Sequence, residues 1–128
     1  MGREIKLMTD KTDYDFAYTL IVSPITFEGM IDTIEQTYER MQDYLAECFG
    51  NRGWGYDLHS HKRIIKEGLY EISLILSFPD DEKTLADSTV NNYIDVLIDY
   101  GEISSGKIDE GNSFPCKCIW RNGRVVDI

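Results

Sequence analysis

The longest periodic apolar pattern in the chain runs from Thr26 to Gly50, and it limits the folds that the rest can adopt. Its apolar residues recur at alternating steps of four and three: Phe27, Ile31, Ile34, Tyr38, Met41, Leu45 and Cys48. That spacing places them on one stripe of an α-helix, with mostly polar residues between. Thr26 is the expected N-cap and Gly50 the expected stop. We therefore predict one helix of about 35 Å, whose stripe must be covered by a sheet.

Two alternating patterns supply that sheet. In residues 14–23 the apolar side chains that share one face are Phe16, Tyr18, Leu20 and Val22. In residues 69–78 they are Tyr70, Ile72, Leu74, Leu76 and Phe78. Period two is typical of strands, and a further strand from about Tyr56 should pair with 69–78 as a hairpin. A short strand is also predicted at 3–8. The first helix should bury Phe27, Ile31, Ile34, Met41 and Leu45 against this sheet.

The second half of the chain again contains an apolar helical stripe followed by strand segments. A helix is expected from about Glu82 or Thr84 to Tyr100, with a stripe made of Ala86, Val90, Tyr93, Leu97 and Tyr100. Residues 102–113 read as a loop, 114–120 as a strand, and Asn122-Gly123 as a hairpin turn. The central order βαββαβ is that of ferredoxin-like folds. We predict one α+β domain over residues 1–128: an antiparallel sheet with two helices on one face, a ferredoxin-like core and a C-terminal β-hairpin.

The net charge of −10 restricts the classes of partner. General nucleic-acid binding and binding to anionic membranes both rely on Lys and Arg, so an acidic chain is poorly suited to either. Hydrophobic residues make up 42% of the chain, which is enough for a core, and no apolar run approaches the ~20 residues of a membrane span. An odd number of cysteines (Cys48, Cys116 and Cys118) without a secretory signal indicates a reducing cytoplasm.

Acidic residues concentrate between residues 79 and 110. Those at the entrance of the second predicted helix and along it are Asp80, Asp81, Glu82, Asp87, Asp95 and Asp99. Such a row can imitate a phosphate backbone and occupy a basic nucleic-acid channel, as small acidic inhibitors of nucleases and of restriction or CRISPR complexes do as a class. We predict a non-catalytic interaction protein, most concretely a phage anti-defence inhibitor of a nucleic-acid-handling protein. An ordinary solvated helix face would explain the same charges without a partner, and a homo-oligomer stays open.

A glycine-rich loop around Trp54 supports an alternative function. Its backbone N–H groups, together with His59, His61, Lys62 and Arg63, could hold the phosphate of a nucleotide or another small ligand beside Trp54. The loop matches neither the P-loop nor the dinucleotide fingerprint. The alternative is therefore a domain that binds or sequesters a small ligand. The simpler explanation is that the glycines serve turns and the tryptophan caps the core.

The same stretch contains candidate metal ligands. On a regular strand Asp57, His59 and His61 would share a face, and Cys116 and Cys118 have the same spacing on another strand. Neighbouring strands in register could then hold zinc, but neither spacing matches an ordinary zinc motif, so we expect no metal and no cofactor. We also expect no enzyme, because no Gly-x-Ser-x-Gly or His-Glu-x-x-His motif occurs and the helix carboxylates have solvated spacing.

Overall fold

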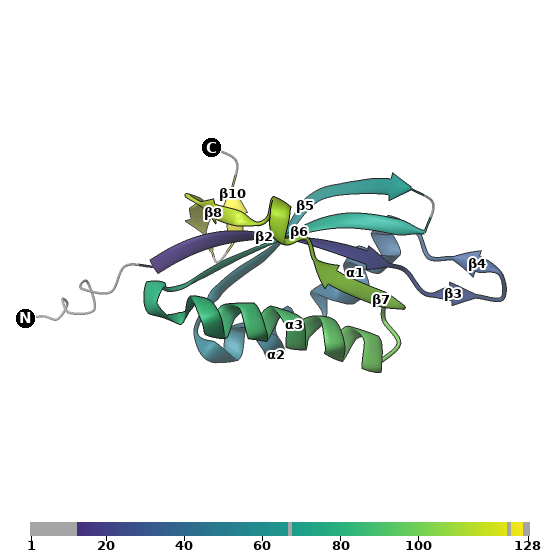
Figure 1. Ribbon diagram of the computed structural model, residues 1–128, viewed down its shortest axis with the longest axis horizontal. Helices are drawn as coiled ribbons and strands as arrows, with labels where there is room; N and C mark the ends of the chain where they lie inside the picture. The colour runs from purple at the N-terminus through teal and green to yellow at the C-terminus, as the bar shows by residue number, and fades with distance from the viewer. Residues whose placement is uncertain (1–12, 67, 123, 127–128) are drawn as a thin grey trace, which may run out of the picture.

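The computed structural model describes residues 13–66, 68–122 and 124–126, so the strand predicted at 3–8 lies outside the described residues. The described part is a mixed α+β protein with three α-helices and an antiparallel main sheet (Figure 1). The strands of this sheet are β2 (Asp13–Ser23), β5 (Gly55–Lys66), β6 (Leu69–Pro79), β7 (Ser105–Ile108) and β8 (Phe114–Cys116). Their order is β5-β6-β2-β7, and β8 pairs with β2 farther along the same edge.

The centre of the sheet is the pair β2 and β6. They run antiparallel from Asp13 opposite Pro79 to Val22 opposite Tyr70. Every side chain predicted to face inward from these two strands is buried: Phe16, Tyr18, Leu20, Val22, Tyr70, Ile72, Leu74, Leu76 and Phe78. The predicted hairpin is also present, since β5 pairs with β6. These predictions are confirmed because a long alternation fixes which face is apolar, and a shift of one residue would turn that whole face toward solvent.

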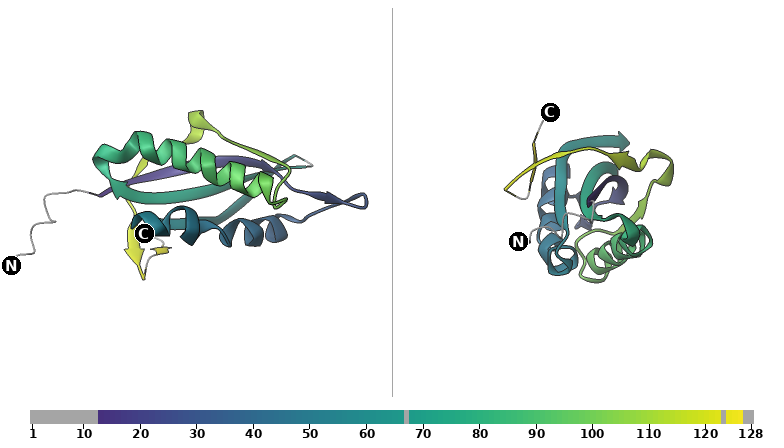
Figure 2. Two further views of the ribbon diagram at one scale, coloured as in Figure 1. Left: turned by 90° about the horizontal axis from the view of Figure 1, so that it is seen from below. Right: turned by 90° about the vertical axis from the view of Figure 1, so that its left-hand side faces the viewer.

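The helix predicted over residues 26–50 is wrong in its first third and interrupted later. Two short strands, β3 (Thr26–Phe27) and β4 (Met30–Ile31), form an arm that projects from one end of the sheet (Figures 1 and 2). The turn residues of the arm, Glu28 and Gly29, have φ angles of 51° and 78°. A right-handed helix excludes these angles, whereas a two-residue hairpin turn requires them. Phe27 and Ile31 are therefore exposed, contrary to the prediction.

The helical part begins after this arm. Helix α1 (Ile34–Gln42) is followed by a two-residue break, by α2 (Leu45–Cys48) and by a 3₁₀ turn, η2 (Gly50–Arg52). Met41 and Leu45 are buried as predicted, and Ile34 is half-buried. The helix starts at its cap: the Gln36 N–H donates to Thr33 Oγ1 at 3.2 Å, and the Thr33 N–H donates to Gln36 Oε1 at 2.8 Å. This capping box satisfies two N–H groups that the first turn leaves without helical partners.

Changing Thr33 to Ala is expected to lower the free energy of unfolding by about 1 kcal/mol, because the Gln36 N–H loses its side-chain acceptor. Chemical denaturation of the variant and the parent protein measures this difference. Thr84→Ala, at an exposed position within α3 (Lys83–Asp99), is the control and should cause no comparable loss. Equal effects at the two positions would mean that the capping box does not stabilise α1.

The second predicted helix is present as a short 3₁₀ turn, η3 (Asp80–Glu82), followed by α3. Its buried residues include Ala86, Val90, Tyr93, Ile94 and Leu97, whereas Tyr100 lies beyond the helix end and is exposed. Figures 1 and 2 show α2 and α3 side by side on one face of the sheet. The Tyr93 hydroxyl joins α3 to α1, because it donates to the Met41 carbonyl at 2.6 Å within the core.

The C-terminal third differs from the prediction in two places. β7 lies within the segment predicted to be a loop, and the strand predicted over 114–120 is divided into β8 and β9 (Ile119–Arg121). The pairing along this edge of β2 is interrupted at Thr19, between β7 and β8. There the Thr19 N–H donates to the side-chain oxygen Ser113 Oγ rather than to a strand carbonyl. β9 pairs antiparallel with β10 (Arg124–Val126).

The ribbon of β9 and β10 crosses the sheet on the side away from α2 and α3, where Figure 1 shows β10. Asp15 holds it there, since its carboxylate accepts hydrogen bonds from the Cys118 N–H and from Trp120 Nε1, each at 3.1 Å. The Trp120 ring lies so close to Gly55 that a Cβ at that position would be 3.6 Å from the ring and 3.2 Å from Ser77.

Among the described residues no helix is both long and apolar enough to cross a membrane.

Candidate functional site

The six acidic residues predicted to bind a partner are spread along the whole of α3. Asp80, Asp81 and Glu82 form η3 at its start, and Asp95 and Asp99 are exposed near its end. The two groups are separated by about 20 Å at 1.5 Å per residue. Asp87 lies between them. The structure therefore places these residues along η3 and α3 but does not bring them together in one cluster.

Asp87 and Glu82 have clear structural partners within the chain. Asp87 Oδ1 accepts a hydrogen bond from the Tyr18 hydroxyl at 2.7 Å and forms an ion pair with Lys83 Nζ at 2.7 Å. Burial raises the pKa of Tyr18 well above its usual range, and the hydrogen bond to Asp87 adds to this effect. Glu82 Oε1 accepts from Trp54 Nε1 at 3.0 Å. Asp87 and Glu82 thus complete the hydrogen bonds of buried aromatic residues, which is a structural role.

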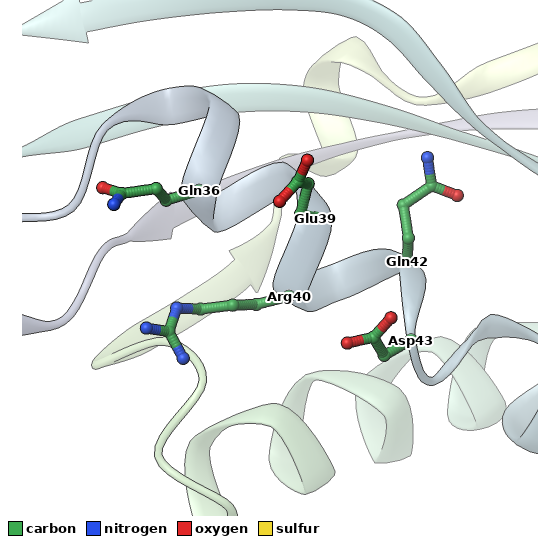
Figure 3. A pocket seen from close by; sticks show the side chains of 5 residues that line it. All are labelled: Gln36, Glu39, Arg40, Gln42 and Asp43. Carbon is green, nitrogen blue, oxygen red and sulfur yellow. The ribbon is translucent and has the colours of Figure 1, made fainter.

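Helix α1 carries a second set of carboxylates. A hollow of about 400 Å³ lies on this helix and is lined by Gln36, Glu39, Arg40, Gln42 and Asp43 (Figure 3). Arg40 extends away from Glu39 and Gln42, and its guanidinium contacts Asp32 at 2.9 Å and Glu102 at 3.0 Å. The hydrogen bond to Glu102 raises the pKa of Arg40. Because the charge of Arg40 is neutralised by Asp32 and Glu102, the carboxylates of Glu39 and Asp43 give the hollow a negative charge.

A pair of tyrosines connects the break between α1 and α2 to the end of α3. The ring centroids of Tyr44 and Tyr100 are 5.7 Å apart. The Tyr44 hydroxyl donates to Glu102 at 2.6 Å, and this hydrogen bond raises the pKa of Tyr44 to about 12. Tyr100 remains 65% exposed. We use the name acidic helix face for five exposed residues of α1, α3 and their C-caps: Glu39, Asp43, Asp95, Asp99 and Tyr100.

The basic residues of the helical segments have partners inside the chain. Arg40 and Lys83 form the ion pairs described above, and Lys83 Nζ also lies 4.3 Å from the ring centroid of Phe16. The guanidinium carbon of Arg52 is 5.4 Å from the ring centroid of Trp54. Within the described helical segments the positive charges are therefore directed toward the body of the protein, and the exposed charge of the acidic helix face is negative.

The loop predicted to bind a ligand has a largely structural tryptophan. Trp54 is only 6% exposed, and its ring centroid is 5.5 Å from that of Phe78. His59 is half-buried on β5, while the side chains of His61, Lys62 and Arg63 lie outside the described part of the structure. The register of β5 against β6 shifts between His59 and Lys62. The regular alternation assumed for His59 and His61 therefore does not hold.

A groove nevertheless lies beside His59. It measures about 570 Å³ and is lined by Tyr38, Asp57, Leu58, His59, Arg121, Asn122, Arg124, Val125 and Val126. Asp57 is buried at its base, where its Oδ2 accepts a hydrogen bond from the Val125 N–H at 3.0 Å and its Oδ1 lies 3.9 Å from Arg124 Nε. Burial raises the pKa of Tyr38; Asp57 acts in the same direction and Arg124 in the opposite one. The groove therefore combines two arginines and a histidine with one buried carboxylate.

The arrangement of strands separates the candidate metal ligands. His59 lies on β5 and Cys116 on β8, with β6 and β2 between these two strands. The two sets therefore do not lie on neighbouring strands, which the zinc hypothesis required. Among the residues that the structure describes, no group of three or more His, Cys, Asp or Glu side chains is placed to hold a metal ion.

The two thiols near β8 allow a prediction about reactivity. Cys116 Sγ and Cys118 Sγ are 3.1 Å apart, and burial, followed by the hydrogen bond between them, raises the pKa of Cys116 to about 12. The reactive thiolate of Cys116 should then be at least ~100-fold less populated at pH 8 than in an unfolded chain. Iodoacetamide labelling followed by peptide mass spectrometry should show slow modification of Cys116 in the folded protein. Fast modification in guanidinium is the control, and equal rates in both states would contradict the expectation.

The chain matches no protein-family model, and neither a curated protein nor a solved structure matches it. The sequence pattern assigned Tyr100 to the apolar stripe of the second helix, and it gave no binding role to Glu39, Asp43, Arg121 or Arg124. A signal for the arginines exists in the sequence, because they flank Asn122-Gly123 and a two-residue hairpin turn places its flanking residues opposite each other. The contact between Tyr44 and Tyr100 joins residues far apart in the chain and has no such local signal.

Proposed function

We propose that this domain is a non-catalytic interaction protein that binds a basic surface of another protein through the acidic helix face. The observation that supports the proposal is the distribution of charge. The basic residues of the helical segments contact internal partners, whereas Glu39, Asp43, Asp95 and Asp99 are exposed. An exposed surface of one sign attracts a surface of the opposite sign and accelerates association.

The chemistry of the face fits lysine and arginine side chains. A cation that enters the hollow on α1 would meet the carboxylates of Glu39 and Asp43, and the amides of Gln36 and Gln42 offer further acceptors (Figure 3). Tyr100 supplies an exposed aromatic ring beside these charges. Aromatic residues of this kind are frequent anchors of protein interfaces, and an arginine can stack on the ring.

The most concrete form of the proposal is an inhibitor of a nucleic-acid-handling protein. A channel that binds phosphates is basic, and carboxylates that occupy it would compete with the nucleic acid. Asp80 and Asp81, which are exposed at the far end of α3, extend the negative row to the length of that helix. We therefore keep a phage anti-defence role in the cytoplasm as the specific hypothesis; the free thiols of Cys48, Cys116 and Cys118 suit a reducing compartment.

We further propose that the core is ferredoxin-like. The strand order β5-β6-β2-β7 supports this, since the first strand of a βαββαβ unit then lies between the third and the fourth. The helical segments connect β2 to β5 and β6 to β7, as such a unit requires. In this arrangement β9 and β10 are a C-terminal addition. The fold itself carries no function, because many unrelated activities occur on this architecture.

Carbodiimide cross-linking tests the interface. The tagged chain is used to capture its partner from the native host, and the complex is treated with the reagent, which joins carboxylates directly to lysines. We expect cross-links from Glu39, Asp43, Asp95 or Asp99 to lysines of the partner, and capture that falls steeply as salt rises. Glu110, exposed on η4 (Glu110–Asn112), is an internal control that should not react with the partner.

The same complex tests inhibition. If the captured protein binds nucleic acid, adding the domain should displace that nucleic acid in a competition assay. Cross-links confined to Glu110 or to other acids away from the acidic helix face would contradict the proposed surface. Capture that is insensitive to salt would contradict the electrostatic mechanism.

A further inference from the structure

We infer that the groove between β5 and the β9–β10 ribbon binds the phosphate group of a small phosphorylated ligand, and that Arg121, Arg124 and His59 hold it. This site contains no residue of the acidic helix face, although Gln42 lines both the hollow on α1 and the smaller hollow beside the groove, and it needs no protein partner. The ligand is of the same phosphate-bearing class as that proposed for the Trp54 loop, but most of the groups that bind it lie on the β9–β10 ribbon. Neither arginine belongs to the set predicted from sequence.

The two arginines form a cross-strand pair of like charge. Arg121 and Arg124 are direct partners in the pairing of β9 with β10. Opposite residues in an antiparallel pair have Cβ atoms about 5 Å apart, and like charges in this position are destabilising. Both side chains line the same groove and both are exposed. A local conflict of this kind is expected where a residue serves a ligand, because a bound anion would turn the repulsion into attraction.

The described residues of the groove compensate only part of this charge. Asp57 is the one carboxylate among the described residues that line the groove, and it faces Arg124 at 3.9 Å. Its other oxygen already accepts the Val125 N–H. Arg121 and His59 add further positive or donor groups to the same walls. Guanidinium groups match the geometry of phosphate oxygens and can donate two hydrogen bonds each, so a phosphate fits this lining better than a neutral ligand does.

The ribbon is held in a fixed position, which favours binding. Asp15 accepts hydrogen bonds from Cys118 and Trp120 at one end, and Asp57 accepts one from Val125 at the other. Anchors on two strands of the sheet reduce the freedom that the arginine backbones would lose on binding a ligand. The backbone that carries the arginines is therefore in place before the ligand arrives.

The volume of the groove sets the size of the ligand. About 570 Å³ lies within the range of small-molecule sites. A second hollow of about 330 Å³ shares Asp57, Asn122 and Arg124 with it and is also lined by Gln42 and Tyr56. The amide of Gln42 and the ring of Tyr56 could contact a base or a sugar while the phosphate lies between the arginines. A nucleotide has the dimensions that occupy both hollows.

Isothermal titration tests the site with inorganic phosphate, pyrophosphate and a panel of nucleoside mono-, di- and triphosphates. We expect saturable binding of at least one of these compounds in the micromolar to millimolar range. Arg121→Gln and Arg124→Gln should each weaken it ~10-fold or more, because each removes a charge-assisted hydrogen bond. Lys66→Gln and Lys107→Gln, at exposed positions away from the groove, are matched controls that remove the same charge and should change the affinity less than about twofold.

Thermal unfolding without ligand provides an independent readout. Arg121→Gln leaves the Asp57–Arg124 contact intact and removes the repulsion, so its Tm should rise above that of the parent protein. The best phosphate ligand should raise the Tm of the parent protein but not that of the double variant at 121 and 124.

Four results would overturn the inference: no binding across the panel, equal affinity of the parent and the arginine variants, citrate binding as tightly as the phosphates, or binding of an oligonucleotide but of no mononucleotide. None of these results involves the acidic helix face, so they leave the proposed protein-binding function untouched.

Discussion

Replacing Phe49 with Ala is expected to lower the free energy of unfolding by roughly 3–5 kcal/mol, one of the two largest effects that the structure predicts. Phe49 is fully buried at the end of α2, and its ring centroid lies 5.2 Å from that of Tyr93 on α3. Truncation removes this aromatic contact and leaves a cavity where the helical segments meet. Urea denaturation of the variant and the parent protein measures the loss, with circular dichroism to confirm that the variant folds.

Phe27→Ala is the matched control. The same atoms are removed, but Phe27 is 68% exposed on β3, so the expected change is within about 0.5 kcal/mol. A continuous helix from Thr26 to Gly50 would place Phe27 on the buried stripe and make its truncation costly. A large loss at Phe27 would therefore contradict the exposed arm, and a negligible loss at Phe49 would contradict the packing of the helical layer.

The sheet could be predicted from sequence because its signal is long and local. Residues 14–23 and 69–78 alternate over about ten positions each, and a shift of one residue would expose the whole apolar face. β7 could not be predicted in this way. Its four residues, Ser105–Ile108, have no apolar alternation of their own, and they pair with residues of β2 that are more than 80 positions earlier in the chain.

The prediction of the first helix was wrong at its start, for a reason that can be found in the sequence. Spacing alone joined Phe27 and Ile31 to the stripe of α1, although residues that are i and i+4 apart in a helix can equally flank a short turn. Gly29 argued against a helix at this point, because its backbone φ angle lies in the left-handed region that favours glycine. Thr33 and Gln36 have the spacing of a capping box and mark the true start of α1.

The candidate sites were predictable only in part. The acidic character of α3 follows from composition, but the sequence does not show that Tyr18 and Trp54 hydrogen-bond to Asp87 and Glu82, because these partners are 69 and 28 residues away. Tertiary packing thus decides which carboxylates of α3 face solvent and which support the core. Asp95 and Asp99 remain candidates for an interface on this basis.

Reversing Asp95 and Asp99 together to Lys is expected to abolish partner binding, with an affinity at least ~100-fold weaker, while the domain stays folded. Each exposed carboxylate would be replaced by a cation that repels a basic surface, and like charges across an interface cost several kcal/mol. Lysines near the end of a helix interact favourably with its dipole, so stability should change little. Pull-down at low and high salt measures binding, and thermal unfolding measures stability.

Glu82→Ala, at the start of α3, is expected to have the opposite effects: it lowers stability but leaves partner binding intact. It leaves the buried N–H of Trp54 without its acceptor, so it should cost roughly 1–3 kcal/mol of stability and still retain the partner when assayed well below its Tm. The two variants together distinguish an interface from a general effect of charge, because both make the protein less acidic but only one alters the acidic helix face. If the reversed variant captures the same partners as the parent protein, that face is not the binding surface. If Glu82→Ala alone loses the partner while folded, the interface lies at the start of α3, around Asp80 and Asp81.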